Sequence, residues 1–519
     1  MPVQNPGVSS LFALHNLHKT ERQLGVSIER ISSGKRINHA GDDAAGGAIA
    51  DRMTSQIKGL NMSVRNASDV LSMAQVAEGA LDESSKVLQR IRELAIQSAS
   101  DLMNGEERLY LQTEANQLIA ELDRVARDTT FNEIAVLDGT FADRRFQIGA
   151  KEREAATVSV GNLRTTAIGN HIVRTEAATG ATLSATAVSL GSAATFADED
   201  FTIHGLLGSK TIDVVAATSA RDIAEAVNIQ FDQTGVSATA STNMKIQAKG
   251  TAGSATLSIG LKGKNTTVRT VSAGVTLAAA VTGSDLTGLS NSINAYSAET
   301  GIVAVLSADK TTIYLTQDEG YDIALTDLDF ADTTDDSRDL QVTGMDARLF
   351  DADGSEILSG TAKTMTDTSH SSGAGKDAIV GGQIMMHGSH SFTVTTTNLN
   401  GDLFQSSPGA ATLNKVSELS LRTRSKAIDA LKVVDKALDK VHMERAKLGA
   451  VMSRMHQAID NLTNVSANTA SARSRIVDAD MAAESAELAK SQVLQQSAMA
   501  MIASASRAQQ SILTLLQGM

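Results

Sequence analysis

Apolar residues recur at helical spacing near both ends of the 519-residue chain. The first stripe, interrupted only by Glu21, consists of Leu14, Leu17, Leu24, Ile28 and Ile31. A second stripe, between about 480 and 517, includes Leu488, Leu494, Ile502, Ile512 and Leu516. Because residues three and four positions apart share one face of a helix, each stripe predicts an amphipathic helix.

The stretch that follows the first stripe is rich in glycine and acidic residues. Gly34 suits a helix C-terminus, and Asp42 or Asp43 suits the N-cap of a helix from 44 to about 100. At about 1.5 Å per residue, that helix would be roughly 85 Å long. The glycines fit neither GxxxxGK(S/T) nor GxGxxG, so a joint between two helices is favoured over a nucleotide site.

Further regular patterns follow along the chain. A third helix is predicted by Leu111, Ala115, Leu118, Leu122 and Val125, and a β-hairpin by the alternation of Phe146, Ile148, Val158 and Val160. Heptads fill 427–462. One heptad position holds Leu431, Leu438, Met452 and Ile459, interrupted by Arg445, and the other holds Ala427, Val434, Val441, Leu448, Met455 and Leu462.

The centre of the chain, from about 170 to 410, has a different composition. Thr, Ser, Ala, Gly and Asp dominate, and short alternating runs such as HSFTVTTT predict small β-rich domains. A repeat is visible at an offset of 66 residues, where Val227, Asn228, Thr234, Gly235, Val236 and Ala238 match Ile293, Asn294, Thr300, Gly301, Ile302 and Ala304. Each copy predicts a short helix, a glycine turn and a strand.

An isolated amphipathic helix cannot bury its own apolar stripe, so the helices at the two ends are expected to pair. The predicted fold class is α+β, with a long coiled-coil-like helical bundle and a β-rich insertion of small subdomains. Three domains are expected: 1–44 with 480–519, 45–170 with 411–479, and 171–410. The two terminal stripes still need partners, which other copies of the chain would supply.

Composition excludes several classes of function. A net charge of −13 argues against nucleic acid as a partner, and the absence of Cys removes disulfides and thiolate chemistry. No apolar run approaches the roughly 20 residues of a membrane span, so no membrane insertion is expected. The N-terminus lacks a secretory pattern, which indicates a cytoplasmic chain or export without a cleavable signal.

Candidate catalytic or metal-binding residues are sparse. His370, His387 and His390 lie in a Gly/Ser-rich region, where surface histidines are favoured over a metal site. Asp351, Asp353 and Glu356 only partly match a calcium loop, and His442 lacks the second histidine of a zinc-protease helix. No catalytic residue, metal or cofactor is therefore predicted, and the chain is expected not to be an enzyme.

Motifs at both ends carry a family resemblance. They include SIERISSGKRIN, DDAAGGAIADRM and ALDESSKVLQRIRELAIQSAS near the N-terminus, and LGAVMSRMHQAIDNL, SARSRIVDADMA and LQQSAMAMIASA near the C-terminus. Over roughly 1–165 and 415–516 the chain resembles bacterial flagellin, the subunit of the flagellar filament used for swimming motility. The resemblance implies that 34–44 joins an inner-core helix to an outer layer, and that 171–410 is variable. It also implies export through the flagellar type III channel to an extracellular filament.

The resemblance implies partners as well. These are other copies of the chain, an export chaperone and the export gate, the filament cap and hook-associated proteins. LQRIRELAIQS matches a helix recognised by a host Toll-like receptor, which makes Leu88, Arg90, Leu94 and Glu114 expected contacts; simple packing of the two leucines is the alternative. A hook–filament junction protein, an enzyme displayed on the scaffold and an adhesive central domain remain alternative functions.

Overall fold

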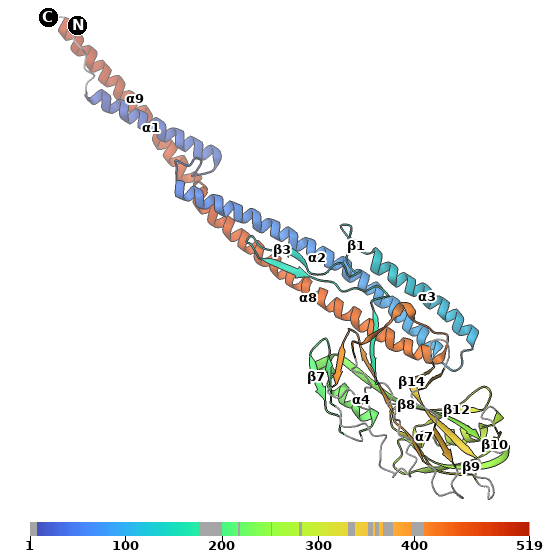
Figure 1. Cartoon of the computed structure of the whole chain (residues 1–519). Helices are drawn as coiled ribbons and strands as arrows, with labels where there is room; N and C mark the ends of the chain where they lie inside the picture. The colour runs from blue at the N-terminus through green and yellow to red at the C-terminus, as the bar shows by residue number, and fades with distance from the viewer. Residues whose placement is uncertain are drawn as a thin grey trace. The chain divides into compact units, whose positions relative to one another are not determined.

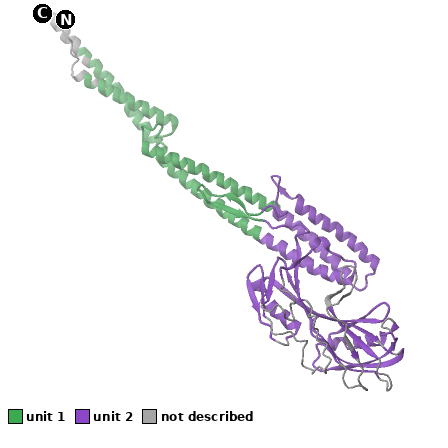
Figure 2. Ribbon diagram, in the orientation of Figure 1, with its two compact units in different colours: residues 1–76, 142–159, 447–519 green, residues 77–141, 160–446 purple. Residues whose placement is uncertain are grey.

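The computed structural model describes residues 8–175, 200–215, 218–250, 252–279, 283–330, 338–350, 356–358, 363–366, 377–396 and 409–517. The chain divides into two compact units (Figure 2). Unit 1 comprises residues 1–76, 142–159 and 447–519, and unit 2 comprises 77–141 and 160–446. Long helices near both ends and β-sheets in the middle confirm the α+β class.

Unit 1 is built from helices contributed by both ends of the chain. Helix α1 (Val8–Ser33) lies beside α9 (Met481–Gln517), as Figure 1 shows. The first part of α2 (Ala44–Ser98) runs beside the last part of α8 (Arg424–Val477), where Ser466 Oγ donates to Asn61 Oδ1 over 2.9 Å. A hairpin is formed by β3 (Arg144–Gln147) and β4 (Ala155–Val158). It contacts α2 through a hydrogen bond from Asn66 Nδ2 to the Gln147 carbonyl.

The helical part of unit 2 contains α3 (Gly105–Asp128) with the remaining turns of α2 and α8. Asn104 and Glu107 form a capping box that begins α3. The helix buries Gln112 and Ile119, whereas the predicted Leu111 and Leu118 are only half-buried. The buried side-chain amide of Gln112 is satisfied by the segment that precedes α8. Gln112 Nε2 donates to the Leu419 carbonyl, and Gln112 Oε1 accepts from Leu421 N.

Helix α8 buries one of its two predicted heptad positions. The buried residues of this position are Ala427, Val434, Val441, Leu448 and Met455. The other position is half-buried, and Ala430, Val433 and Ala437 are buried beside it. Arg445, which interrupts that second position, forms ion pairs with Glu78 and Asp82 of α2. The stripe is therefore wider than the two-position seam of a simple coiled coil.

Unit 2 also contains the β-rich insertion, whose largest sheet has nine strands among the residues that the structure describes. Its main path runs in the order β11 (Val303–Leu306), β12 (Thr312–Gln317), β8 (Val236–Lys249), β18 (Gln383–Gly388), β5 (Gly169–Arg174) and β20 (Thr412–Lys415). Off this path lie β14 (Asp339–Phe350), β15 (Glu356–Leu358) and β16 (Lys363–Thr366).

Smaller sheets complete this unit among the described residues. One has the order β10 (Arg269–Leu277), β9 (Gly253–Lys262), β13 (Ile323–Phe330) and β17 (Ala378–Val380), and another has β19 (Thr393–Thr396), β6 (Phe201–His204) and β7 (Ser209–Ile212). A short pair joins β1 (Thr130–Phe131) and β2 (Ile134–Ala135). A 3-10 turn at Val416–Glu418 leads toward α8.

The two sequence repeats have the same local geometry. In the first, α4 (Ala220–Ile229) and α5 (Phe231–Thr234) precede Gly235 at φ 73° and β8; in the second, α6 (Thr287–Ala295) and α7 (Ser297–Thr300) precede Gly301 at φ 72° and β11. Asn228 exchanges two hydrogen bonds with the backbone of Ala238, and Asn294 does the same with Ala304. The predicted order of helix, glycine turn and strand is confirmed in both copies.

Candidate functional site

The joint between α1 and α2 contains the predicted Gly34, Asp42 and Asp43. Gly34 follows the last residue of α1 at φ 70°, a left-handed conformation that favours glycine. Asp43 Oδ1 accepts a hydrogen bond of 2.8 Å from Gly46 N, so Asp43 is the N-cap of α2. Asp42 Oδ2 accepts from the backbone amides of Asn38 and His39, both at 2.9 Å, and these bonds lower the pKa of Asp42.

A second joint, between α8 and α9, lies directly against the first. Lys35 and Asp478 form an antiparallel bridge, flanked by hydrogen bonds from Arg36 N to the Val477 carbonyl and from Ala479 N to the Gly34 carbonyl. The Arg36 guanidinium also donates to the Ile476 carbonyl. The two joints therefore form one backbone-bonded structure from segments about 440 residues apart.

Beyond the joints, α1 contacts α9 mostly through small and polar residues. Arg30 forms a 2.9 Å ion pair with Glu484, and both side chains are largely shielded. Ser27 and Ser491 are each 1% exposed. Small side chains allow the two helices to approach closely, and few large apolar groups are buried between them.

The first predicted stripe divides into two heptad positions. Leu17 is buried, and Leu24 and Ile31 are half-buried on the same position. Leu14 and Ile28 belong to the other position, with Glu21 between them, and they are 42% and 52% exposed. Incomplete cover of α1 by α9 leaves the second heptad position of this stripe without a partner in the single chain.

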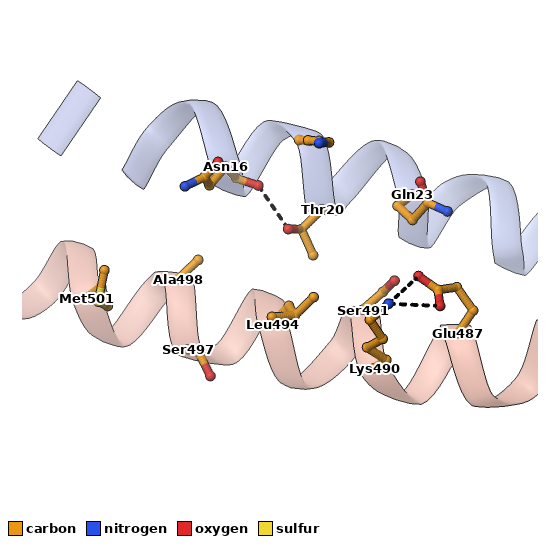
Figure 3. Close-up of a pocket in the computed structure, with 11 residues that line it drawn as sticks. Asn16, Thr20, Gln23, Glu487, Lys490, Ser491, Leu494, Ser497, Ala498 and Met501 are labelled. Atoms are coloured by element: carbon orange, nitrogen blue, oxygen red, sulfur yellow. Dashed lines mark hydrogen bonds and ion pairs between the residues drawn. The ribbon is translucent and has the colours of Figure 1, made fainter. Parts of the chain in front are cut away.

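The second stripe is also only partly covered. Leu488 and Ile502 are half-buried, whereas Leu494 is 48% exposed. Leu494 lines a groove of about 540 Å³ between α1 and α9 (Figure 3), with Asn16, Lys19, Thr20, Gln23, Glu487, Lys490, Ser491, Ser497, Ala498 and Met501. The side chains of Ile512 and Leu516 lie outside the described residues.

The expected receptor contacts separate into buried and exposed residues. Leu88 and Leu94 are 0% and 1% exposed, so they pack inside the helical bundle and cannot present their side chains to a receptor. This corrects their assignment as contacts. Arg90 is half exposed and forms ion pairs with Glu93 at 2.9 Å and Glu114 at 2.7 Å.

The histidines that could have bound a metal have other partners where they are described. His387 is buried, with Nδ1 2.9 Å from Asn170 Nδ2 and Nε2 3.0 Å from Thr239 Oγ1, and burial lowers its pKa to about 3. His390 Nδ1 lies 3.2 Å from Ser389 Oγ. His370, Asp351, Asp353 and the side chain of Glu356 lie outside the described residues.

The described part of the chain contains neither a metal-binding cluster nor a membrane-spanning helix. No group of three or more His, Asp or Glu residues is arranged to hold a metal ion within those ranges. In the same part of the chain, no helix is long and apolar enough to cross a bilayer. His442, the remaining candidate, is an exposed residue on α8.

A chain with half-covered apolar helices at both ends and an inserted β-rich region belongs to the class of self-assembling structural subunits. Residues 5–142 match the bacterial flagellin N-terminal helical region, residues 431–516 the C-terminal helical region, and residues 200–252 the flagellin hook IN motif. The chain belongs to the bacterial flagellin family, and it is a subunit of the flagellar filament.

Two relatives agree with this assignment by sequence. The chain is 35% identical to the B-type flagellin of Pseudomonas aeruginosa and 31% identical to a flagellin of Salmonella typhimurium, in each case over 99% of both chains. Among solved structures, FliC from Burkholderia pseudomallei aligns with 74% of this chain and 99% of its own at 14% identity, with a TM-score of 0.28. Flagellins are structural proteins that form filaments.

Proposed function

We propose that α1 and α9 make the principal contacts between subunits in the inner core of the filament. The observation that carries this proposal is the half-exposure of Leu14, Ile28 and Leu494 on two helices that cover each other incompletely. Residues 45–170 with 411–479 would form the outer tube, and 171–410 the surface domains. The role is structural and not catalytic.

The balance of burial and ordering free energies favours contacts of this kind. Burying one Leu or Ile contributes about 1.5–3 kcal/mol, while ordering one residue costs about 1–2 kcal/mol in backbone entropy. The α1–α9 pair buries few large apolar groups, so its stability alone is marginal. Neighbouring subunits would cover the remaining side chains and complete the folding of both helices.

Limited proteolysis compares the two states directly. In monomer, the protease should trim roughly 1–40 and 475–519 and leave the remainder, whereas filament should resist cleavage at both ends. Coupled folding and assembly predicts this difference, and equal resistance of monomer and filament would refute it. Electron microscopy of seeded protein provides the assembly control and separates a long filament from a short junction.

We also propose an extracellular filament whose subunits are exported without removal of a signal peptide. The family's filament-forming role supports this route. An export chaperone and the export gate would be partners inside the cell, and the cap and hook-associated proteins would be partners outside. Mass spectrometry of secreted chain should find an uncleaved N-terminal segment; loss of 15–30 residues would contradict the proposal.

A host Toll-like receptor is a further proposed partner of the monomer. Arg90 and Glu114 are the exposed, ion-paired residues of the matching helical surface. Arg90→Ala should weaken activation of receptor-bearing cells, whereas Lys86→Ala, which removes another exposed and ion-paired base of α2, should have less effect. Unchanged activation by the Arg90 variant would remove these residues from the proposed contact.

A further inference from the structure

The methionines of this chain have an uneven distribution. The sequence contains 17 Met and no Cys, so the thioether is its only oxidisable sulfur. Among the described side chains, the exposed methionines are Met62, Met481, Met499 and Met501, and all four lie in unit 1. The methionines of the β-sheets that are described, such as Met244 and Met386, are buried.

Met499 and Met501 are the most exposed of the group, at 58% and 63%. The face of α9 that meets α1 is marked by Ser491, buried to 1% exposure, and by the half-buried Ile502. Two positions along a helix turn the side chain by roughly 200°. The two methionines therefore flank the α1-facing side of α9, one on each side.

Met501 also lines the α1–α9 groove, where its thioether lies on α9 near one end of the row of lining residues (Figure 3). Leu494 and Ala498 line the same groove from earlier turns of α9. A neighbouring subunit that covers Leu494 would thus meet Met501 on the same surface. Met499, on the other flank, would meet a second surface.

We propose that Met499 and Met501 form an oxidation site that controls entry of the subunit into the filament. Peroxide or hypochlorous acid would convert both thioethers to sulfoxides in unassembled chain, and oxidised chain would fail to join a growing filament. Assembled subunits would be protected because neighbours cover both flanks of α9. This inference rests on the proposed role of α9 in subunit contacts.

The reaction is a two-electron oxygen transfer. The thioether sulfur attacks an oxygen of hydrogen peroxide, a sulfur–oxygen bond forms, the oxygen–oxygen bond breaks, and water leaves after proton transfer. With hypochlorous acid the oxygen–chlorine bond breaks and chloride and a proton are released. Sulfur is oxidised and the oxidant is reduced in both cases, and a methionine sulfoxide reductase reverses the change.

A sulfoxide changes the assembly surface because it places a strong hydrogen-bond acceptor where a flexible apolar side chain had been. Burial of an acceptor without a donor is unfavourable. Each buried sulfoxide should therefore weaken subunit addition by about tenfold or more. Folding of unit 2 should be unaffected, because the described part of unit 2 contains no exposed methionine.

The test measures seeded elongation of full-length chain before and after graded oxidation, with peptide mass spectrometry to quantify each sulfoxide. Met499→Leu with Met501→Leu conserves apolar volume and removes both reactive sulfurs. Met62→Leu is the matched control, because Met62 is exposed on α2 of the same unit. Reductase treatment of oxidised wild-type chain provides a second test that needs no substitution.

The expected result is that oxidised wild type and Met62→Leu lose elongation by at least about tenfold, the double variant keeps it, and reductase restores it. Normal elongation of chain oxidised at both positions would overturn the proposal, as would equal inactivation of the double variant. If the double variant does not assemble even before oxidation, the reductase result decides. If Met499 and Met501 are oxidised as fast in the filament as in the monomer, neighbouring subunits do not cover α9, and the proposed role of α9 in subunit contacts is refuted.

Discussion

At the scale of single residues, the two neighbouring aspartates of the joint have different tasks. Asp43 caps α2 through Gly46 N, while Asp42 accepts bonds from the preceding Asn38 and His39 amides. A side chain without an acceptor oxygen at either position would leave backbone donors without an acceptor. Both aspartates therefore fix the path of the chain from α1 into α2.

Substitution of Asp43 tests the cap. Asp43→Ala should lower the free energy of unfolding by about 1 kcal/mol, because it removes the acceptor at the start of α2. Asp43→Asn retains an acceptor oxygen and should behave almost as wild type. Thermal or urea unfolding of the monomer measures both; identical losses in the two variants would contradict a capping role.

His387 makes the stability of unit 2 depend on pH. Its pKa is about 3 in the folded chain because of burial, and about 6.5 in an unfolded chain. Below pH 6.5 the unfolded state binds the proton first, so stability should fall as pH decreases toward 3, by at most about 1.4 kcal/mol per pH unit. His171, whose pKa burial lowers to about 4, adds to this fall in the same direction.

Urea unfolding at several pH values checks this prediction. His387→Gln should flatten the loss of stability between pH 6 and 4, after allowance for a constant offset from lost packing. His15→Gln, which alters an exposed histidine of α1, should leave the slope unchanged. A slope in His387→Gln equal to that of wild type would show that another group controls the acid sensitivity.

Residue patterns predicted the joint between α1 and α2, but not its bridge to the joint between α8 and α9. Gly34 and the aspartates are local signals, because a left-handed turn and a cap depend on neighbouring backbone groups. The bridge between Lys35 and Asp478 is a contact between distant segments, and neither residue type is distinctive. Leu88 and Leu94 are likewise buried, and the motif match did not distinguish a buried leucine from an exposed contact.

At the scale of elements, the strands β5 and β20 close the insertion at its base. They pair antiparallel, with Ile172 opposite Thr412 and Gly169 opposite Lys415. Neighbouring strands lie about 4.8 Å apart, so the two chain segments that enter and leave the insertion are adjacent. The sequence predicted β structure from about 170 to 410, a range that excludes β20. Alternation within single strands also contains no information on a pairing across 240 residues.

This adjacency makes a deletion possible. Removal of about 175–410, with a short Gly/Ser linker between the two strands, should leave a chain that still forms filaments, because α1, α2, α8 and α9 are retained. Electron microscopy after seeding measures assembly, and circular dichroism verifies the helices. Helical but non-assembling chain would show that the surface domains supply essential contacts.

The helices show why a heptad pattern specifies less than a packing. Leu24 and Ile28 have equally good spacing, yet α9 half-buries the first and leaves the second exposed. Periodicity defines a face of the helix but not the width that a partner covers. The sequence therefore predicted α1 and its apolar residues, and only the structure distinguishes the side that meets α9.

At the scale of the whole molecule, one chain combines two kinds of surface. The terminal helices cover each other incompletely and retain exposed Leu14, Ile28 and Leu494. The β-rich insertion also exposes apolar side chains such as Val305, but it has its own closed cores, one of them around Met244, Ile246 and Leu315. Exposed apolar side chains on a filament-forming protein are candidates for contacts between copies. We therefore assign polymerisation to the terminal helices and display to the insertion.

Seeded elongation of Ile28→Asp and Val305→Asp tests this division most directly. The two side chains are matched in exposure, at 52% and 53%, but Ile28 lies on α1 and Val305 on β11 of the insertion. Because both are exposed in the single chain, neither substitution should change monomer unfolding by more than about 0.5 kcal/mol. We expect Ile28→Asp to abolish elongation and Val305→Asp to elongate normally. Normal filaments from Ile28→Asp would show that the terminal helices do not make the subunit contacts.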